Sequence, residues 1–66
     1  MKFGEKLKYL RKGIKGLTQE KLSKEIGVSS RTIISYENGV SYPKKREVYS
    51  KLATLFNVDI NYLLTE

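Results

Sequence analysis

Two short segments with helical periodicity lie on either side of Gly27-Val28-Ser29, and this corner limits the possible folds more than any other feature of the sequence. The first segment runs from about Gln19 to Ile26, and the second follows Ser29 and extends to about Asn38. A three-residue turn that contains glycine joins two helices at a steep angle. The second helix is therefore expected to project from the body of the protein.

The residues around this corner have the character that a close crossing of two helices requires. Ser23 is small enough to let the helices approach each other, and Thr18 and Ser29 stand in N-cap positions. Apolar side chains from both segments are available for the contact: Leu22, Ile26, Val28, Ile33 and Tyr36. These spacings predict a helix-turn-helix over residues 18–38, with residues 30–38 as its second helix. The alternative is an ordinary helical corner.

The rest of the chain predicts three more helices and no strand. A first helix runs from about Phe3 to Lys12, and Gly13 is expected to end it. Its apolar and basic residues are expected to lie mostly on different faces, with Phe3, Leu7 and Leu10 inside and Lys6, Lys8, Arg11 and Lys12 outside. A fourth helix spans roughly residues 45–56 and ends at Asn57, and a short fifth helix follows the cap Asp59. Residues 1–66 are thus expected to form one all-α domain of five helices.

The apolar positions of these five segments define one predicted core. Hydrophobic staples, in which a residue before the cap packs on one inside the helix, pair Leu17 with Leu22, Val28 with Ile33 and Val58 with Leu63. The full inward set is Phe3, Leu7, Leu10, Leu17, Leu22, Ile26, Val28, Ile33, Tyr36, Val48, Leu52, Leu55, Phe56, Val58, Ile60 and Leu63. We expect these residues to serve packing alone.

Histidine and cysteine are both absent, which removes the commonest general base and the usual zinc ligands. Seven carboxylates are spread along the chain without a cluster. We therefore expect no enzyme activity, no cofactor and no metal. No apolar run approaches the roughly 20 residues needed to cross a bilayer, so we expect a cytoplasmic protein.

The net charge of +6 is large for 66 residues and is unevenly distributed. Residues 1–46 hold twelve basic and four acidic residues, whereas residues 47–66 hold one lysine and three acidic residues. A basic body favours a polyanionic partner, although excess lysine also serves solubility alone in many small domains.

The stretch Leu17-Thr18-Gln19-Glu20-Lys21-Leu22-Ser23-Lys24-Glu25-Ile26-Gly27-Val28-Ser29 resembles the Cro/C1-type (Xre) family of phage and bacterial repressors. Ile33, the run Tyr36-Glu37-Asn38-Gly39, Pro43, Leu52-Ala53 and Leu63-Leu64 continue the likeness over nearly the whole chain. The resemblance implies a compact five-helix, lambda-repressor-like domain that binds operator DNA, usually as a dimer. The chain departs from the family at Lys44, where a capping Ser or Thr is usual, and at Asn57, where glycine is frequent.

In such a fold the N-terminal part of the third helix meets base edges in the major groove. The outward residues that we expect to read bases are Ser30, Arg31, Ile34 and Ser35. Arg31 can donate two hydrogen bonds to guanine, with a phosphate contact or a solvated surface position as the alternatives. Ile34 is expected to contact a thymine methyl group, or else a hydrophobic neighbour or a second subunit.

A second group of residues is expected to contact phosphates. These are Gln19, Ser29, Asn38, Tyr42, Lys44, Lys45 and Arg46. Gln19 combines its amide with the open N–H groups of a helix start, and the basic run at residues 44–46 follows the predicted turn. Asn38 is included because the family resemblance implies a backbone contact there. Glu37, being acidic, is expected to be structural.

The leading hypothesis is a sequence-specific transcriptional regulator, most simply a repressor that binds double-stranded palindromic DNA as a homodimer. The less basic C-terminal end offers a dimer surface of Ile60, Tyr62, Leu63 and Leu64, unless these residues simply close the core. The alternative is a protein-interaction module on the same fold, such as an antitoxin or a coactivator domain. A role at a membrane surface is not expected, because no helix combines a strong apolar face with a fully basic one. The chain is either a small complete regulator or the DNA-binding part of a protein with a further C-terminal domain.

Overall fold

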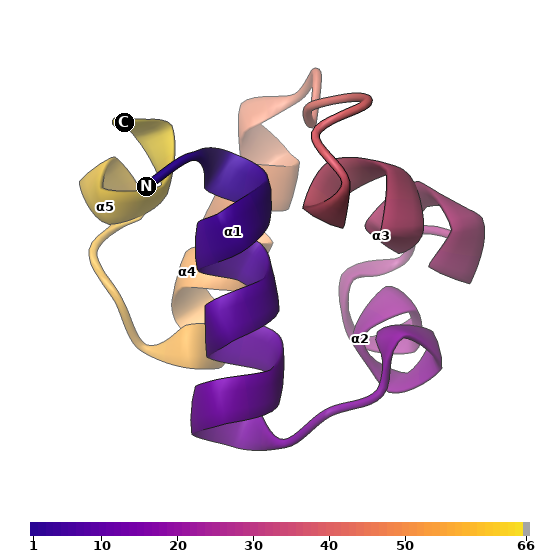
Figure 1. The fold of residues 1–66 in the computed structure, drawn as a ribbon. Helices are drawn as coiled ribbons and strands as arrows, with labels where there is room; N and C mark the ends of the chain where they lie inside the picture. The colour runs from indigo at the N-terminus through magenta and orange to yellow at the C-terminus, as the bar shows by residue number, and fades with distance from the viewer. Residues whose placement is uncertain (66) are drawn as a thin grey trace.

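The computed structural model describes residues 1–65, which are helical throughout apart from turns and connections (Figure 1). The elements are α1 (Phe3–Lys8), a π-helical segment η1 (Tyr9–Lys15), α2 (Gln19–Ile26), α3 (Ser30–Glu37), α4 (Arg46–Phe56) and α5 (Ile60–Leu64). No strand occurs among the described residues. The expectation of an all-α fold with five helical units is confirmed, because α1 and η1 form one continuous rod.

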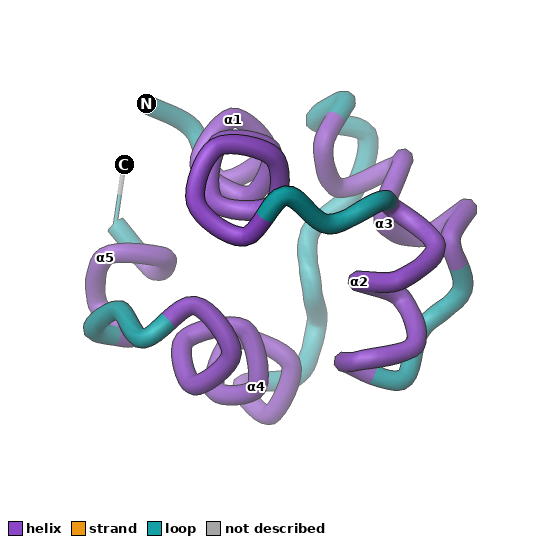
Figure 2. Tube along the Cα trace, turned by 90° about the horizontal axis from the view of Figure 1, so that it is seen from below, coloured by secondary structure: helices purple, strands orange, loops and turns teal. Residues whose placement is uncertain are grey.

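The helices divide into two groups around the rod of α1 and η1. Seen along this rod, α4 and α5 lie on one side and the pair α2 and α3 on the other (Figure 2). The N-terminus lies beside α5, away from α2 and α3 (Figures 1 and 2). The domain measures 24 × 23 × 21 Å. None of its described helices is both long enough and apolar enough to traverse a bilayer.

Local sequence signals set the starts of three helices, as predicted. The Thr18 hydroxyl accepts a hydrogen bond from the backbone N–H of Lys21 at 3.0 Å. Ser29 accepts one from Thr32 at 3.1 Å, and the Asp59 carboxylate accepts one from Asn61 at 2.8 Å. Each bond satisfies an N–H group that has no partner inside its helix. The caps of α2, α3 and α5 are therefore confirmed.

The predicted end of the first helix at Gly13 is wrong. The rod continues through η1 to Lys15 and ends at Gly16, whose φ of 63° lies in the left-handed region. The carbonyl of Arg11 accepts hydrogen bonds from the N–H groups of Gly16 and Leu17 and closes this end. Gly16 lies three residues after Gly13, and a glycine permits a helix to end without requiring it.

The core agrees with the predicted set, with two additions. Ten of the predicted residues are buried: Phe3, Leu7, Leu10, Leu22, Ile26, Ile33, Tyr36, Leu52, Phe56 and Leu63. The remaining six are partly buried against them: Leu17, Val28, Val48, Leu55, Val58 and Ile60. Ala53 is also buried and Tyr49 packs at the edge of the core. Phe3 lies at the centre of an aromatic group, with ring centroids 5.3–6.1 Å from those of Tyr36, Tyr42 and Tyr49.

Two basic residues that were expected outside the core are buried. Lys6 is 5% exposed and Arg11 is 7% exposed. Lys6 lies three residues after Phe3, and Arg11 lies four residues after Leu7, so helical spacing places both on the apolar face. Their charge had argued for the surface. The structure instead supplies each charge with acceptors, which offsets the cost of removing it from water.

Candidate nucleic-acid interface

Helix α3 turns one face to solvent and the other to the core. Ile33 and Tyr36 are buried, whereas Ser30, Arg31 and Ile34 are exposed. Ser35 is half-buried, so it is the least accessible of the four predicted base-reading residues. The face that carries Arg31 is therefore not covered by the protein itself. A side chain that can donate two parallel hydrogen bonds stands free on the second helix of the corner.

A close approach of the backbone fixes the C-terminal end of α3. Helix α1 packs against α3, and a Cβ atom at Gly4 would lie 2.4 Å from the carbonyl oxygen of Tyr36 and 2.9 Å from that of Glu37. These separations are far below contact distance, so only glycine fits at position 4. Gly4 is a packing position that sequence reasoning missed, because its partners lie more than 30 residues away.

A buried ion pair joins the rod to α3. The Arg11 guanidinium donates from Nε and Nη2 to the two carboxylate oxygens of Glu37 at 2.6 and 3.1 Å. Arg11 Nη1 also donates to the carbonyl of Leu17 at 2.8 Å, just before α2 begins. The expected structural role of Glu37 is thus confirmed, and its partner is Arg11. The fork geometry fixes both the distance and the angle between η1 and α3.

The amide of Gln19 belongs to the same network. Its Nε2 donates to Glu37 at 3.0 Å, so the first residue of α2 is tied to the last residue of α3. Gln19 is also expected to contact a phosphate, so its amide has to serve both Glu37 and the phosphate. One N–H of the amide is committed to Glu37, which leaves its carbonyl oxygen, its second N–H and its backbone N–H. Gln19 is therefore held in place before any ligand arrives.

The remaining residues that we expect to contact phosphates lie at the two ends of α3 and in the segment from α3 to the first residue of α4. Asn38, Lys44, Lys45 and Arg46 are all exposed, and Tyr42 is exposed with its ring packed on Phe3. The Ser29 hydroxyl is exposed but already caps α3. Helix α4 starts at Arg46 without a side-chain cap, which agrees with the missing Ser or Thr at position 44. Val40, in the connection after α3, is a further exposed apolar residue that the sequence analysis did not single out.

A family described as a helix-turn-helix domain matches this chain over residues 4–66. The chain belongs to that family. The match covers the corner, the exposed face of α3 and the connection to α4, and it confirms the resemblance to Xre-type domains. The helix-turn-helix domain thus accounts for nearly the whole sequence.

Several named regulators are similar to this helix-turn-helix domain. The HTH-type transcriptional activator BcrR of Enterococcus faecalis is 42% identical over 65 residues, which are 98% of this chain and 31% of the activator. An uncharacterised HTH-type transcriptional regulator of Methanocaldococcus jannaschii is 46% identical over 55 residues, 83% of this chain and 80% of the relative. Another from Archaeoglobus fulgidus is 44% identical over 48 residues, 73% of this chain and 67% of the relative.

These relatives bear on the expected length of the protein, on its expected origin and on its expected regulatory role. The chain spans about a third of the length of BcrR, so that activator contains much more than this helix-turn-helix domain. Two of the relatives are archaeal, whereas the resemblance had pointed to bacteria and phages. One relative is named as an activator, and none of the three is named as a repressor.

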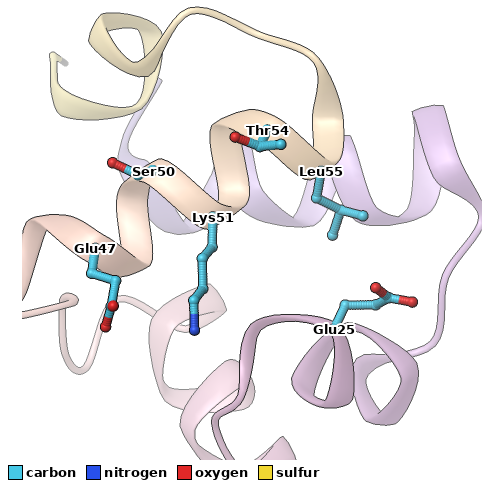
Figure 3. A pocket seen from close by; sticks show the side chains of 6 residues that line it. All are labelled: Glu25, Glu47, Ser50, Lys51, Thr54 and Leu55. Atoms are coloured by element: carbon cyan, nitrogen blue, oxygen red, sulfur yellow. The ribbon is translucent and has the colours of Figure 1, made fainter.

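A hollow between α2 and α4 lies outside the predicted DNA-contacting residues of the helix-turn-helix domain. Glu25 from α2 and Glu47, Ser50, Lys51, Thr54 and Leu55 from α4 line it (Figure 3). Two of its charged side chains are carboxylates, which repel a phosphate backbone. The hollow therefore does not extend the candidate DNA surface.

The predicted dimer surface on α5 is only partly exposed. Tyr62 and Leu64 are 38% and 41% exposed, and Ile60 is half-buried. Leu63 is 2% exposed and belongs to the core, so its expected place on the surface is wrong. Leu63 is part of the core against which Val58 packs, and this inward position is the alternative that the sequence left open.

Proposed function

We propose that this helix-turn-helix domain binds double-stranded DNA within a transcriptional regulator and reads sequence with α3 in the major groove. The observation that carries this proposal is the exposed, polar outer face of α3, held at its far end by the Gly4 contact and the Arg11–Glu37 pair. A reading helix has to be both accessible and rigid, because misplaced donors lose their bidentate geometry. The similarity to HTH-type transcriptional regulators supports the same function.

Roles within this proposal follow from side-chain chemistry. Arg31 is the principal base-reading residue, by two hydrogen bonds to guanine O6 and N7. Ile34 packs on a thymine methyl group, and the short side chains of Ser30 and Ser35 read bases through water or at close range. Gln19, Ser29, Asn38, Tyr42 and the basic run Lys44-Lys45-Arg46 contact phosphates and set the register on the duplex.

The bound form is a homodimer on a palindromic operator. A single domain of this size offers few base contacts, so two half-sites about 34 Å apart are needed for adequate specificity. Repression requires only that the bound dimer occupy the operator. It is therefore the regulatory outcome that this domain can produce without further contacts.

Selection of bound sequences from a random pool of duplexes tests the proposal directly. We expect a palindromic consensus, with guanine at a position that Arg31→Ala renders indifferent. The affinity for the selected duplex should exceed that for scrambled duplex by about 10³-fold or more at physiological salt. Recovery of no consensus, together with capture of a specific protein partner, would favour the antitoxin or coactivator type of module instead.

A further inference from the structure

The buried side chain of Lys6 links α1 to the far end of the chain. Its ammonium group donates to the backbone carbonyl of Tyr62 at 2.6 Å and to that of Thr65. The same nitrogen lies 4.7 Å from the centre of the Tyr62 ring. Lys6 therefore holds both the backbone and the aromatic ring at the C-terminal end of α5, across more than 55 residues of sequence.

Helix α5 depends on such a contact because it is very short. It has five residues, Asp59 caps its start, and Leu63 is its one fully buried side chain. A helix of this length does not persist on its own in water. A cation at a helix C-terminus also interacts favourably with the helix dipole and with the open carbonyl groups there. Lys6 thus supplies a hydrogen-bond donor and a positive charge at the C-terminal end of α5.

The surface that this arrangement orders is suited to a second copy of the chain. Tyr62 and Leu64, both in the last turn of α5 that Lys6 holds, are 38% and 41% exposed. Residues 57–65 contain no lysine or arginine and one aspartate, so α5 itself adds no positive charge to a contact between two copies of a chain with a net charge of +6. Helix α5 also lies away from α3, which stays free when α5 is covered (Figure 2).

The size of the domain agrees with this placement. Two copies that meet at α5 would hold their α3 helices no more than about two domain widths apart, and one width is 21–24 Å. One turn of DNA, about 34 Å, falls within that range.

We propose that Lys6 is a positioning residue for self-association. By holding the C-terminal end of α5, it fixes Tyr62 and Leu64 in the arrangement on which a second copy docks. This inference rests on the proposed dimer. It assigns to a basic side chain of the first helix a role in pairing two subunits, remote from the surface that reads DNA.

The experiment compares Lys6→Met, which removes the donor, with Lys6→Arg, which keeps it. Lys8→Met is the matched control, because Lys8 is exposed on the same helix. Each variant is measured on the palindromic duplex recovered by the selection and on a duplex in which one half-site is scrambled. Sedimentation equilibrium without DNA measures self-association independently, and circular dichroism sets an assay temperature at which every variant is folded.

Lys6→Met should weaken binding to the full palindrome about tenfold while leaving the scrambled-half duplex nearly unchanged, since coupling between sites is commonly 5- to 150-fold. Lys6→Arg should restore most of the coupling, and Lys8→Met should change both duplexes by the same factor. Tyr62→Ala removes the exposed ring without opening the core, and it should reproduce the loss on the palindrome even if Lys6→Met does not fold.

Three results would each overturn a different part of the proposal. A wild-type protein that binds both duplexes equally and stays monomeric removes the dimer itself. A wild-type protein that prefers the palindrome, with Lys6→Met retaining that preference in full, leaves the dimer in place and removes the role of Lys6. An equal loss on both duplexes for Lys6→Met means that Lys6 acts only on overall stability.

Discussion

Two charged side chains of the first helical rod, Lys6 and Arg11, lie inside the protein, where each makes a specific long-range connection. Lys6 joins α1 to α5, and Arg11 joins η1 to α2 and α3. Burial of a charge is costly unless hydrogen bonds satisfy it, and both residues have several acceptors. These two side chains therefore do more to orient the helices than to strengthen the core.

Replacement of Glu37 by glutamine tests the buried ion pair. The variant keeps the shape but leaves the Arg11 charge without its counter-ion, and breaking a buried pair typically costs about 3–5 kcal/mol. We expect the free energy of unfolding in urea to fall by an amount near the lower end of that range. An Arg11→Met/Glu37→Leu double variant should be clearly more stable than Glu37→Gln. Equal losses for the two variants would mean that the charge pair is not the cause.

Replacement of Arg31 by alanine tests the proposed base contact. Arg31 is exposed and stands on the outer face of α3, so its loss should leave the thermal midpoint unchanged. Affinity for the selected duplex should fall by about 1–3 kcal/mol, with loss of preference at one base pair. Lys51→Ala, which removes a positive charge in the hollow beside α4, is the control. Uniform weakening on all sequences would make Arg31 a phosphate ligand.

At the scale of elements, the rod of α1 and η1 passes one glycine and ends at another. Gly13 lies within η1, where an added Cβ would contact the Tyr9 ring at 3.4 Å. Gly16 has open space around it but a φ of 63°. The two positions thus differ in backbone conformation rather than in crowding.

Alanine substitutions at these two glycines should have opposite effects on stability. Gly13→Ala should stabilise by about 0.5–1 kcal/mol, because it lowers the entropy of the unfolded chain at a helical position. Gly16→Ala should destabilise by about 1–2 kcal/mol, because a Cβ strains the left-handed conformation. Chemical denaturation of both variants measures this. The reverse order of stabilities would show that the helix ends at Gly13 after all.

At the scale of the whole molecule, two features matter for binding and stability: the distribution of basic residues and the group of tyrosines around Phe3. Twelve of the thirteen basic residues lie within residues 1–46, whereas α5 itself carries no charge and its cap Asp59 is acidic. A group of tyrosines packs around Phe3 at the N-terminal end of the rod. These two regions predict how binding responds to salt and how stability responds to pH.

The salt dependence of DNA binding tests the basic run after the turn. Lys44→Ala and Lys45→Ala should each lower the slope of log affinity against log salt by about one, since each contact releases about one counter-ion. Lys24→Ala is a suitable control, because Lys24 pairs with Glu20 on α2 at 3.6 Å. A slope unchanged in both variants would remove these lysines from the interface.

Stability should decline at alkaline pH because of the buried Tyr36 and the partly buried Tyr49. Burial raises the pKa of Tyr36 above its ordinary 10.0. Burial, with the charges of Tyr36 and Tyr42 contributing, raises the pKa of Tyr49 in the same direction. The unfolded state therefore loses these protons first, and the stability present below pH 10 falls as pH rises further. Tyr49→Phe and Tyr36→Phe should flatten this decline relative to the exposed control Tyr9→Phe. Parallel declines in all three variants would contradict the assignment.

The positions of the helices, the starts of three of them and most of the core could be predicted from local sequence signals. Thr18, Ser29 and Asp59 act on N–H groups two or three residues away, and apolar spacing of three and four residues defines an inner face. Such effects are local, so they can be read along the chain. The same spacing is compatible with inward positions for Lys6 and Arg11, but their charge led to the prediction that they lie outside, which is wrong.

The assembled fold was needed to identify the partners of these inward charges and the glycine that ends the rod. It also showed the reason that position 4 has to be glycine. The Arg11–Glu37 pair spans 26 residues and the contacts of Lys6 span more than 55, and no periodicity relates residues at such separations. The same holds for Leu63, which the chain could turn toward a second subunit or toward its own core. These choices depend on how five helices pack together, because burial and close contact are properties of the assembled fold.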